Sequence, residues 1–181
     1  MHEMTTTTRT RSRRRGHFRG LSLGLALMAV AGCRQEDLPV PTSEEAAEYY
    51  AAVPDLTVEM SGNVAEVTVV QSAAQLRRGG SLWARVGPYI YLFSDATQSL
   101  FTDYPGLAAV RVITRTAGGT EVARATLARG TLNELTWRRA LNVAGLARRD
   151  GTERVTLLED LVEWGEDRTE FEYNSRYVQR R

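Results

Sequence analysis

The 181-residue sequence contains no lysine, one cysteine (Cys33) and only two histidines, His2 and His17. All 23 basic residues are therefore arginine. Nucleophilic catalysis near neutral pH usually uses a histidine, or a lysine or cysteine of lowered pKa. Zinc, haem and iron–sulfur sites need cysteine or histidine ligands in almost all cases. From residue 34 onward the chain has none of these three side chains, so we expect no metal, no cofactor and no enzymatic activity.

Long hydrophobic runs are also scarce, and the longest uncharged apolar stretch lies near the N-terminus. Residues 1–20 hold six arginines and one glutamate, and Leu21–Gly32 follows with no charge. A basic region, a short apolar region and small residues at its end are typical of a secretory signal peptide. Twelve helical residues rise about 18 Å, which is too short for a hydrocarbon core of about 30 Å. We therefore expect residues 1–32 to be an export signal and not a permanent transmembrane helix.

The apolar stretch ends in Val30-Ala31-Gly32-Cys33, and this sequence resembles the lipobox of bacterial lipoproteins. The resemblance covers residues 1–33 only. It implies cleavage between Gly32 and Cys33, diacylglycerol on the Cys33 thiol, and acylation of the new amino terminus with a fatty acid such as palmitate. Several acyl chains together give stable anchoring. The alternative is a cysteine that stands near an ordinary cleavage site by chance, or an inert buried cysteine.

The resemblance also implies a location. A lipid on Cys33 would anchor the protein to the bacterial cell envelope, on its periplasmic or extracellular face. Arg34 follows the cysteine, which is compatible with the outer membrane in a Gram-negative cell. Cleavage would leave 17 arginines against 21 acidic residues, a net charge of −4. The basic terminus is then an export signal, and we expect no nucleic-acid binding.

Four parts are expected along the chain: the signal peptide 1–32, a lipid anchor and tether 33–41, one domain 42–178, and a frayed terminus 179–181. Strand-like alternation of apolar and polar residues occurs at 56–60 and 65–69, and again at 110–114 and 121–127. Turn-forming residues separate the members of each pair, so each pair predicts a β-hairpin. The fold class is α+β: an antiparallel sheet of two hairpins packed by helices, in the order hairpin–helix–hairpin–helix. A short final strand is expected at 171–173.

Helices are expected after capping-box sequences that begin at Thr42, Thr131 and Thr156. The segment 72–105 is less clear. Gly79-Gly80 should interrupt any helix that begins at Ala73, and apolar residues then recur at helical spacing from Trp83 to Tyr104. The alternative is a buried strand at 89–93, because that run is aromatic and β-branched. We favour a helix here, restarted or kinked near Pro88.

Three groups of side chains are candidates for function. The aromatic residues Trp83, Tyr89, Tyr91 and Phe101 form a candidate interaction surface, although residues at helical spacing usually belong to a core. Acidic residues are dense between 159 and 172, where a solvated helix face is the simpler explanation. The arginine pairs 77–78 and 148–149 could contact phosphates or lipid head groups, or they could be ordinary loop and helix-end residues.

These observations favour a membrane-anchored envelope lipoprotein with a non-catalytic domain that binds protein partners. One alternative is a lipid- or glycan-binding module that uses the Trp83–Tyr104 aromatic segment. A second alternative is a carboxylate-only hydrolase of an envelope polymer, because paired carboxylates about 5–10 Å apart can cleave glycosidic bonds without histidine or lysine.

Overall fold

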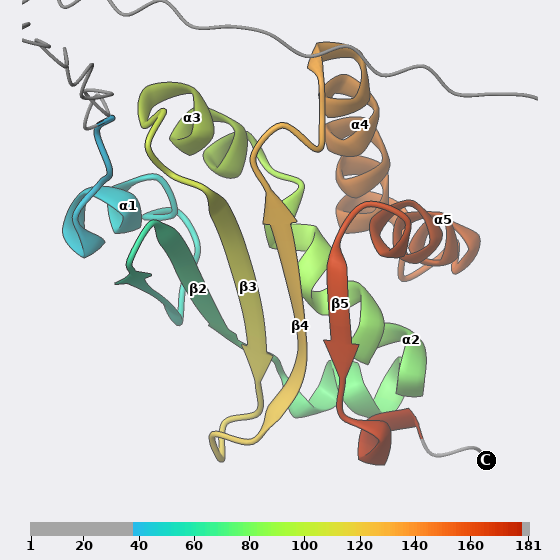
Figure 1. Cartoon of the computed structure of the whole chain (residues 1–181). Helices are drawn as coiled ribbons and strands as arrows, with labels where there is room; N and C mark the ends of the chain where they lie inside the picture. Colours follow the sequence, from blue (N-terminus) through green and yellow to red (C-terminus); the bar gives the residue numbers. More distant parts are fainter. Residues whose placement is uncertain (1–37, 179–181) are drawn as a thin grey trace, which may run out of the picture. The chain divides into compact units, whose positions relative to one another are not determined.

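Two β-hairpins make up most of a five-stranded sheet (Figure 1). The computed structural model describes residues 38–178. The strands are β1 (Leu56–Ser61), β2 (Val64–Val70), β3 (Ala109–Arg115), β4 (Glu121–Ala128) and β5 (Glu170–Tyr173). Strands β1 and β2 pair antiparallel, as do β3 and β4, which confirms both hairpins. Gly62 and Gly119 adopt φ of 62° and 81° in the two turns, a conformation that glycine reaches without a Cβ penalty.

The sheet is mixed, and here the prediction of a purely antiparallel sheet of two hairpins is wrong. The strand order is β1-β2-β3-β4-β5, and β2 runs parallel to β3. A parallel pair needs a connection that returns the chain to its starting end. Helices α2 (Ala73–Leu92) and α3 (Asp95–Asp103) supply that connection. The fifth strand, β5, pairs antiparallel with β4 and confirms the strand expected at 171–173.

The helices cover one face of the sheet, with α2 crossing behind the strands in Figure 1. The remaining helical elements are α1 (Ser43–Glu48), α4 (Glu134–Asp150), α5 (Thr156–Glu166) and the 3-10 helix η1 (Ser175–Val178). Alternate residues of the central strands face the helices, including Val67, Val112 and Ala125, which are fully buried. The next residue along each strand points away from the helices, because side chains alternate across a sheet.

Helix α2 is continuous through Gly79-Gly80, so the expected interruption there does not occur. The reason is packing: Val86, Tyr89 and Leu92 are completely buried, and such burial outweighs the helix propensity that glycine lacks. The helix also contains Pro88, which has no N–H to donate to the preceding turn. The Gln71 side-chain amide donates to the Trp83 carbonyl in this region, with Nε2 to O 2.7 Å.

The first capping box is confirmed, and the other two do not form at the expected residues. Thr42 caps α1 and exchanges hydrogen bonds with Glu45. Helix α4 begins two residues later than expected, because Asn133 forms its capping box with Thr136. Helix α5 follows Val155 and has no side-chain cap. A capping sequence therefore located each helix to within a turn but identified the capping residue only once.

Several expectations concern residues outside the described range 38–178. These are the signal peptide 1–32, the cleavage site at Gly32 and Cys33, the lipid on Cys33, and the terminus 179–181. Within the described residues, none of the helices has the length and apolar character needed to cross a bilayer.

Candidate interaction surface

The face of the sheet turned away from the helices carries a row of charged and polar side chains, which we call the polar face. Its members lie on all five strands: Glu59, Glu66, Arg111, Arg124, Thr126, Glu170 and Glu172. Cross-strand register places Glu66 beside Arg111 and Arg111 beside Thr126. No helix of the described chain lies over this face (Figure 1). An antiparallel or mixed sheet commonly leaves one face to solvent, so exposure alone assigns no function.

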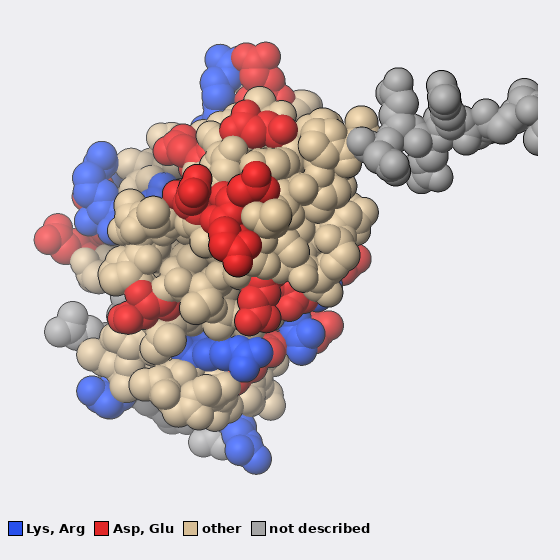
Figure 2. Space-filling model, turned by 90° about the vertical axis from the view of Figure 1, so that its left-hand side faces the viewer, with Lys and Arg blue, Asp and Glu red and all other residues tan. Residues whose placement is uncertain are grey.

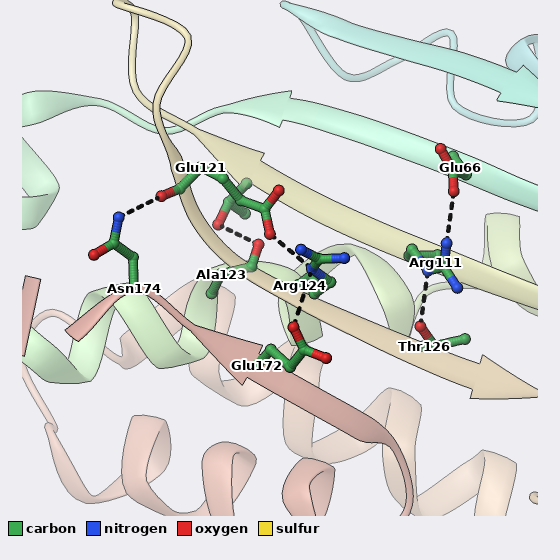
Figure 3. A network of polar contacts seen from close by, with 9 residues as sticks. Glu66, Arg111, Glu121, Ala123, Arg124, Thr126, Glu172 and Asn174 are labelled. Atoms are coloured by element: carbon green, nitrogen blue, oxygen red, sulfur yellow. Dashed lines mark hydrogen bonds and ion pairs between the residues drawn. The ribbon is translucent and has the colours of Figure 1, made fainter.

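Specific hydrogen bonds hold the charges of the polar face in place (Figure 3). Arg111 donates from Nη1 to Oε1 of Glu66 at 2.7 Å and from Nε to the Thr126 hydroxyl at 3.1 Å. The side chains of Arg111 and Glu66 are 31% and 27% exposed, so the pair is partly shielded and still reachable. One arginine is therefore fixed between neighbouring strands on both sides.

A second network lies closer to the β3–β4 turn. Arg124 donates from Nε to Oε1 of Glu121 at 2.7 Å and pairs with Glu172 of β5 at 3.5 Å. Asn174 donates to the Glu121 carbonyl at 3.2 Å and ties the end of β5 to β4 (Figure 3). Ile113, which is only 7% exposed, lies in register between Thr68 and Arg124 on the same face.

The two networks contribute order more than stability. Exposed ion pairs stabilise a fold by about 0–1 kcal/mol each. However, because the arginine and the glutamate are already held in one arrangement, less side-chain conformational entropy is lost when a partner binds. Arginine is also enriched at protein interfaces and among their energetically dominant residues. The polar face is thus a preorganised surface with complementary charges arranged side by side.

The aromatic residues singled out in the sequence do not form one exposed surface. Tyr89 is completely buried, stacks on Phe93 with ring centroids 5.7 Å apart, and accepts a hydrogen bond from the Thr169 hydroxyl. Phe101 is 8% exposed, and Trp83 and Tyr91 are half-buried. The helical spacing that suggested a core was therefore the better indication for Tyr89 and Phe101.

A pocket of about 400 Å³ lies between α3, the end of β4 and the start of α4. Phe101, Leu132 and Trp137 form its apolar walls, and Arg129 lies at its side. Arg129 donates to the carbonyls of Phe101, Leu107 and Tyr104, where it closes the C-terminal end of α3. Desolvation lowers the pKa of Arg129 from its usual value.

A smaller pocket of about 30 Å³ is lined by Trp83, Gln71 and their neighbours. Neither of these pockets is lined by an Asp or Glu, so neither offers the paired carboxylates of a hydrolase.

The acidic segment 159–172 is spread over three surfaces. Glu159 and Glu163 are exposed on α5, whereas Glu166 receives a bidentate hydrogen bond from Arg85 of α2, with Nη2 to Oε1 and Oε2 at 2.5 and 2.6 Å. Glu172 belongs to the polar face. No group of three or more His, Cys, Asp or Glu side chains within residues 38–178 is arranged to hold a metal ion.

One of the two basic pairs, 148–149, has structural partners. Arg148 donates to the Ile90 carbonyl near the end of α2 at 2.8 Å. Arg149 donates to Asp150, and this hydrogen bond lowers the pKa of the Asp150 carboxyl. Arg77 is exposed on α2. Both arginines of the second pair are thus engaged at helix ends.

The polar face was not recognised in the sequence, although its signal is present. Glu66 belongs to the first hairpin, and Arg111 and Arg124 belong to the second. Each occupies a polar position in a strand where apolar and polar residues alternate, and this pattern shows only which side of its own hairpin the residue lies on. The parallel pairing of β2 with β3 brings Glu66 next to Arg111, and that pairing has no local sequence pattern. Comparison of the chain with protein-family models, curated proteins and solved structures finds no match.

Proposed function

We propose that the protein is a bacterial cell-envelope lipoprotein, anchored through lipid on Cys33, whose domain is non-catalytic and binds a protein partner through the polar face. The lipobox-like sequence supports the anchor. The ordered Glu66–Arg111–Thr126 network on an uncovered sheet face is the observation that carries the binding role. An uncovered sheet face of fixed, complementary charges suits a protein surface of matching pattern, whereas small-molecule sites are usually concave pockets.

Site-specific crosslinking in native membranes tests this proposal. A photo-crosslinking residue replaces Glu59 or Glu170, which are exposed at opposite sides of the polar face. The matched control places the same residue at Arg138, an exposed position on α4 of the helical side. We expect the same partner protein to be captured from both polar-face positions and not from the control. No reproducible partner from either polar-face position would contradict the proposal.

Once the partner is known, substitution of Arg111 measures its contribution. Arg111→Gln removes the central charge of the network and should weaken binding by about 1–2 kcal/mol, roughly five- to thirtyfold in Kd. Arg138→Gln removes the same charge from α4 and should leave Kd unchanged. Equal effects of the two substitutions would show that net charge, and not the polar face, determines binding.

The pocket beside Phe101 supports a second candidate, a lipid-binding module. Its volume of about 400 Å³ lies in the usual range for small-ligand sites, and its lining mixes the apolar Phe101, Leu132 and Trp137 with polar groups that include Arg129. Phe101, Leu132 and Trp137 suit an acyl chain, and Arg129 suits its carboxylate. A fluorescent fatty acid should bind with micromolar affinity and lose affinity in a Leu132→Trp variant, which fills the pocket. If the fluorescence does not saturate when the fatty acid is titrated with the unsubstituted protein, the lipid-binding function is excluded.

A further inference from the structure

Arg115 lies on the same side of the sheet as the polar face, close to the β3–β4 turn. It ends β3, and it shares a side with Arg111 because side chains alternate along a strand. Arg111 and Arg124 each donate a hydrogen bond to a glutamate of the polar face or of its border. Within residues 38–178, by contrast, Arg115 has no hydrogen-bond acceptor and no ion-pair partner. Its charge therefore differs from the other two in having no contact that balances it.

The nitrogens of the Arg115 guanidinium differ in their access to solvent. Nε is buried, and no acceptor of the described chain reaches it. The side chain as a whole is half-buried, and its two terminal nitrogens keep contact with solvent. A charged donor that is partly desolvated and unpaired lowers the stability of the free protein. Arg115 thus presents donor groups to solvent that the domain itself does not use.

The strand neighbours of Arg115 explain why no carboxylate beside it is free to pair. Register places Val70 of β2 on one side of Arg115 and Glu121 of β4 on the other. Glu121 accepts from Nε of Arg124 at 2.7 Å, and Val70 is apolar and 45% exposed. The register of β3 with β4 shifts between Thr114 and Arg115, where β4 contains an extra residue. Such bulges commonly re-aim a side chain next to a functional site.

The surrounding charges restrict the kind of surface that can bring an acceptor to Arg115. Carboxylates occupy the outer strands of the polar face, with Glu59 on β1 and Glu170 and Glu172 on β5. Every charged residue between 38 and 76 is acidic, and acidic side chains gather on the side of the molecule that carries α1 and β1 (Figure 2). These carboxylates repel a partner that is acidic throughout. A single carboxylate in a neutral or basic surface escapes most of this repulsion and can reach Arg115.

We propose that Arg115 binds a carboxylate of the protein partner and determines which partner the polar face accepts. Arginine presents planar pairs of N–H donors that match a carboxylate. Val70 and Ile113, which is 7% exposed, supply adjoining apolar surface that excludes water from the pair. A partner without the carboxylate would leave the guanidinium buried and unpaired, and this penalty provides the specificity. The inference rests on the proposed binding function of the polar face, and it adds the chemistry of the partner.

Partner capture by Arg115 variants tests the inference. The full chain carries the photo-crosslinking residue at Glu59, and Arg138→Gln on α4 is the matched control. Arg115→Met removes the guanidinium and keeps an unbranched stem, whereas Arg115→Lys keeps the charge but not the planar donor pair. In native membranes we expect Arg115→Met to reduce capture severalfold, Arg115→Lys to retain part of it, and Arg138→Gln to leave it unchanged. With the captured partner in hand, Arg115→Met should raise Kd by about tenfold.

Urea denaturation of the same purified variants separates binding from folding. The midpoint of Arg115→Met should equal or exceed that of the unsubstituted protein, because an apolar side chain replaces an unpaired charged one. A lower midpoint would give the guanidinium a structural role in the free protein and overturn the inference. Unchanged capture with Arg115→Met would overturn it too and leave the binding function intact. If the unsubstituted protein captured no partner, or only a second copy of this chain, the binding function itself would be refuted, and the inference with it.

Discussion

Gly165 and Gly145 form a matched pair that tests how closely α5 packs on the core. Both lie inside helices with ordinary backbone angles. A Cβ on Gly165 would meet the Tyr89 ring at 2.5–2.7 Å, whereas a Cβ on Gly145 would meet nothing within 4 Å. The same substitution, glycine to alanine, therefore adds a methyl group to a full site in one case and to open space in the other.

The expected free energies of unfolding have opposite signs. Alanine in place of helical glycine stabilises by about 0.5–1 kcal/mol through helix propensity and unfolded-state entropy. Gly145→Ala should show this gain. Gly165→Ala gains the same amount but forces Tyr89 to move within a closed core, and such overpacking costs about 1–3 kcal/mol. Tyr89 cannot swing into solvent, because it is completely buried between Phe93 and Phe171.

Urea denaturation of the domain measures both effects. We expect Gly165→Ala to be about 1–3 kcal/mol less stable than Gly145→Ala, with unchanged m values. Gly165→Ala should cost less stability in a Tyr89→Leu background than in the unsubstituted protein, because the ring that the added methyl group displaces is gone. Equal stability of the two glycine variants would refute the close contact between α5 and α2.

Three further predictions concern polar groups inside the fold. Burial raises the pKa of Tyr50 to about 12, against 10 in the unfolded chain. The stability that the neutral phenol contributes is therefore complete below pH 10 and is lost as the pH rises from 10 to 12. Phenolate absorbance, recorded during alkaline unfolding, measures this loss. Arg129→Lys should destabilise by about 1–2 kcal/mol in urea, because an ammonium cannot reach the three carbonyls that the guanidinium bridges, whereas Arg138→Lys should be neutral. Glu166→Gln should cost at most about 1 kcal/mol, and the loss should shrink in high salt, because its partner Arg85 is one third exposed.

Elements whose signal is local were predictable from the sequence. The alternation of apolar and polar residues at 56–60, 65–69, 110–114 and 121–127 was clear enough to locate both hairpins, and the Gly118-Gly119 pair located the second turn. The Thr42 capping box fixed the start of α1. In each case a few neighbouring residues determine the conformation, so the pattern and the structure agree.

Elements decided by tertiary contact were not predictable. Helix α2 passes through Gly79-Gly80 because its buried face supplies more stability than two glycines remove. The parallel pairing of β2 and β3, and with it the contact of Glu66 and Arg111, depends on where the connecting helices return the chain. The hydrogen bond from the Gly106 amide to the Pro39 carbonyl likewise joins residues far apart in the sequence. The candidate surface depends on these contacts, which is why local patterns pointed to the aromatic segment instead.

The central claim is that Cys33 is the lipid-bearing N-terminus of the mature protein. Mass spectrometry of the protein purified from membranes of its own host tests it most directly. We expect the N-terminal peptide to begin at Cys33 and to carry a diacylglycerol on sulfur together with an acyl group on its amino terminus. An N-terminal peptide that retains residues 1–32, or that shows Cys33 as a free thiol, would contradict the claim.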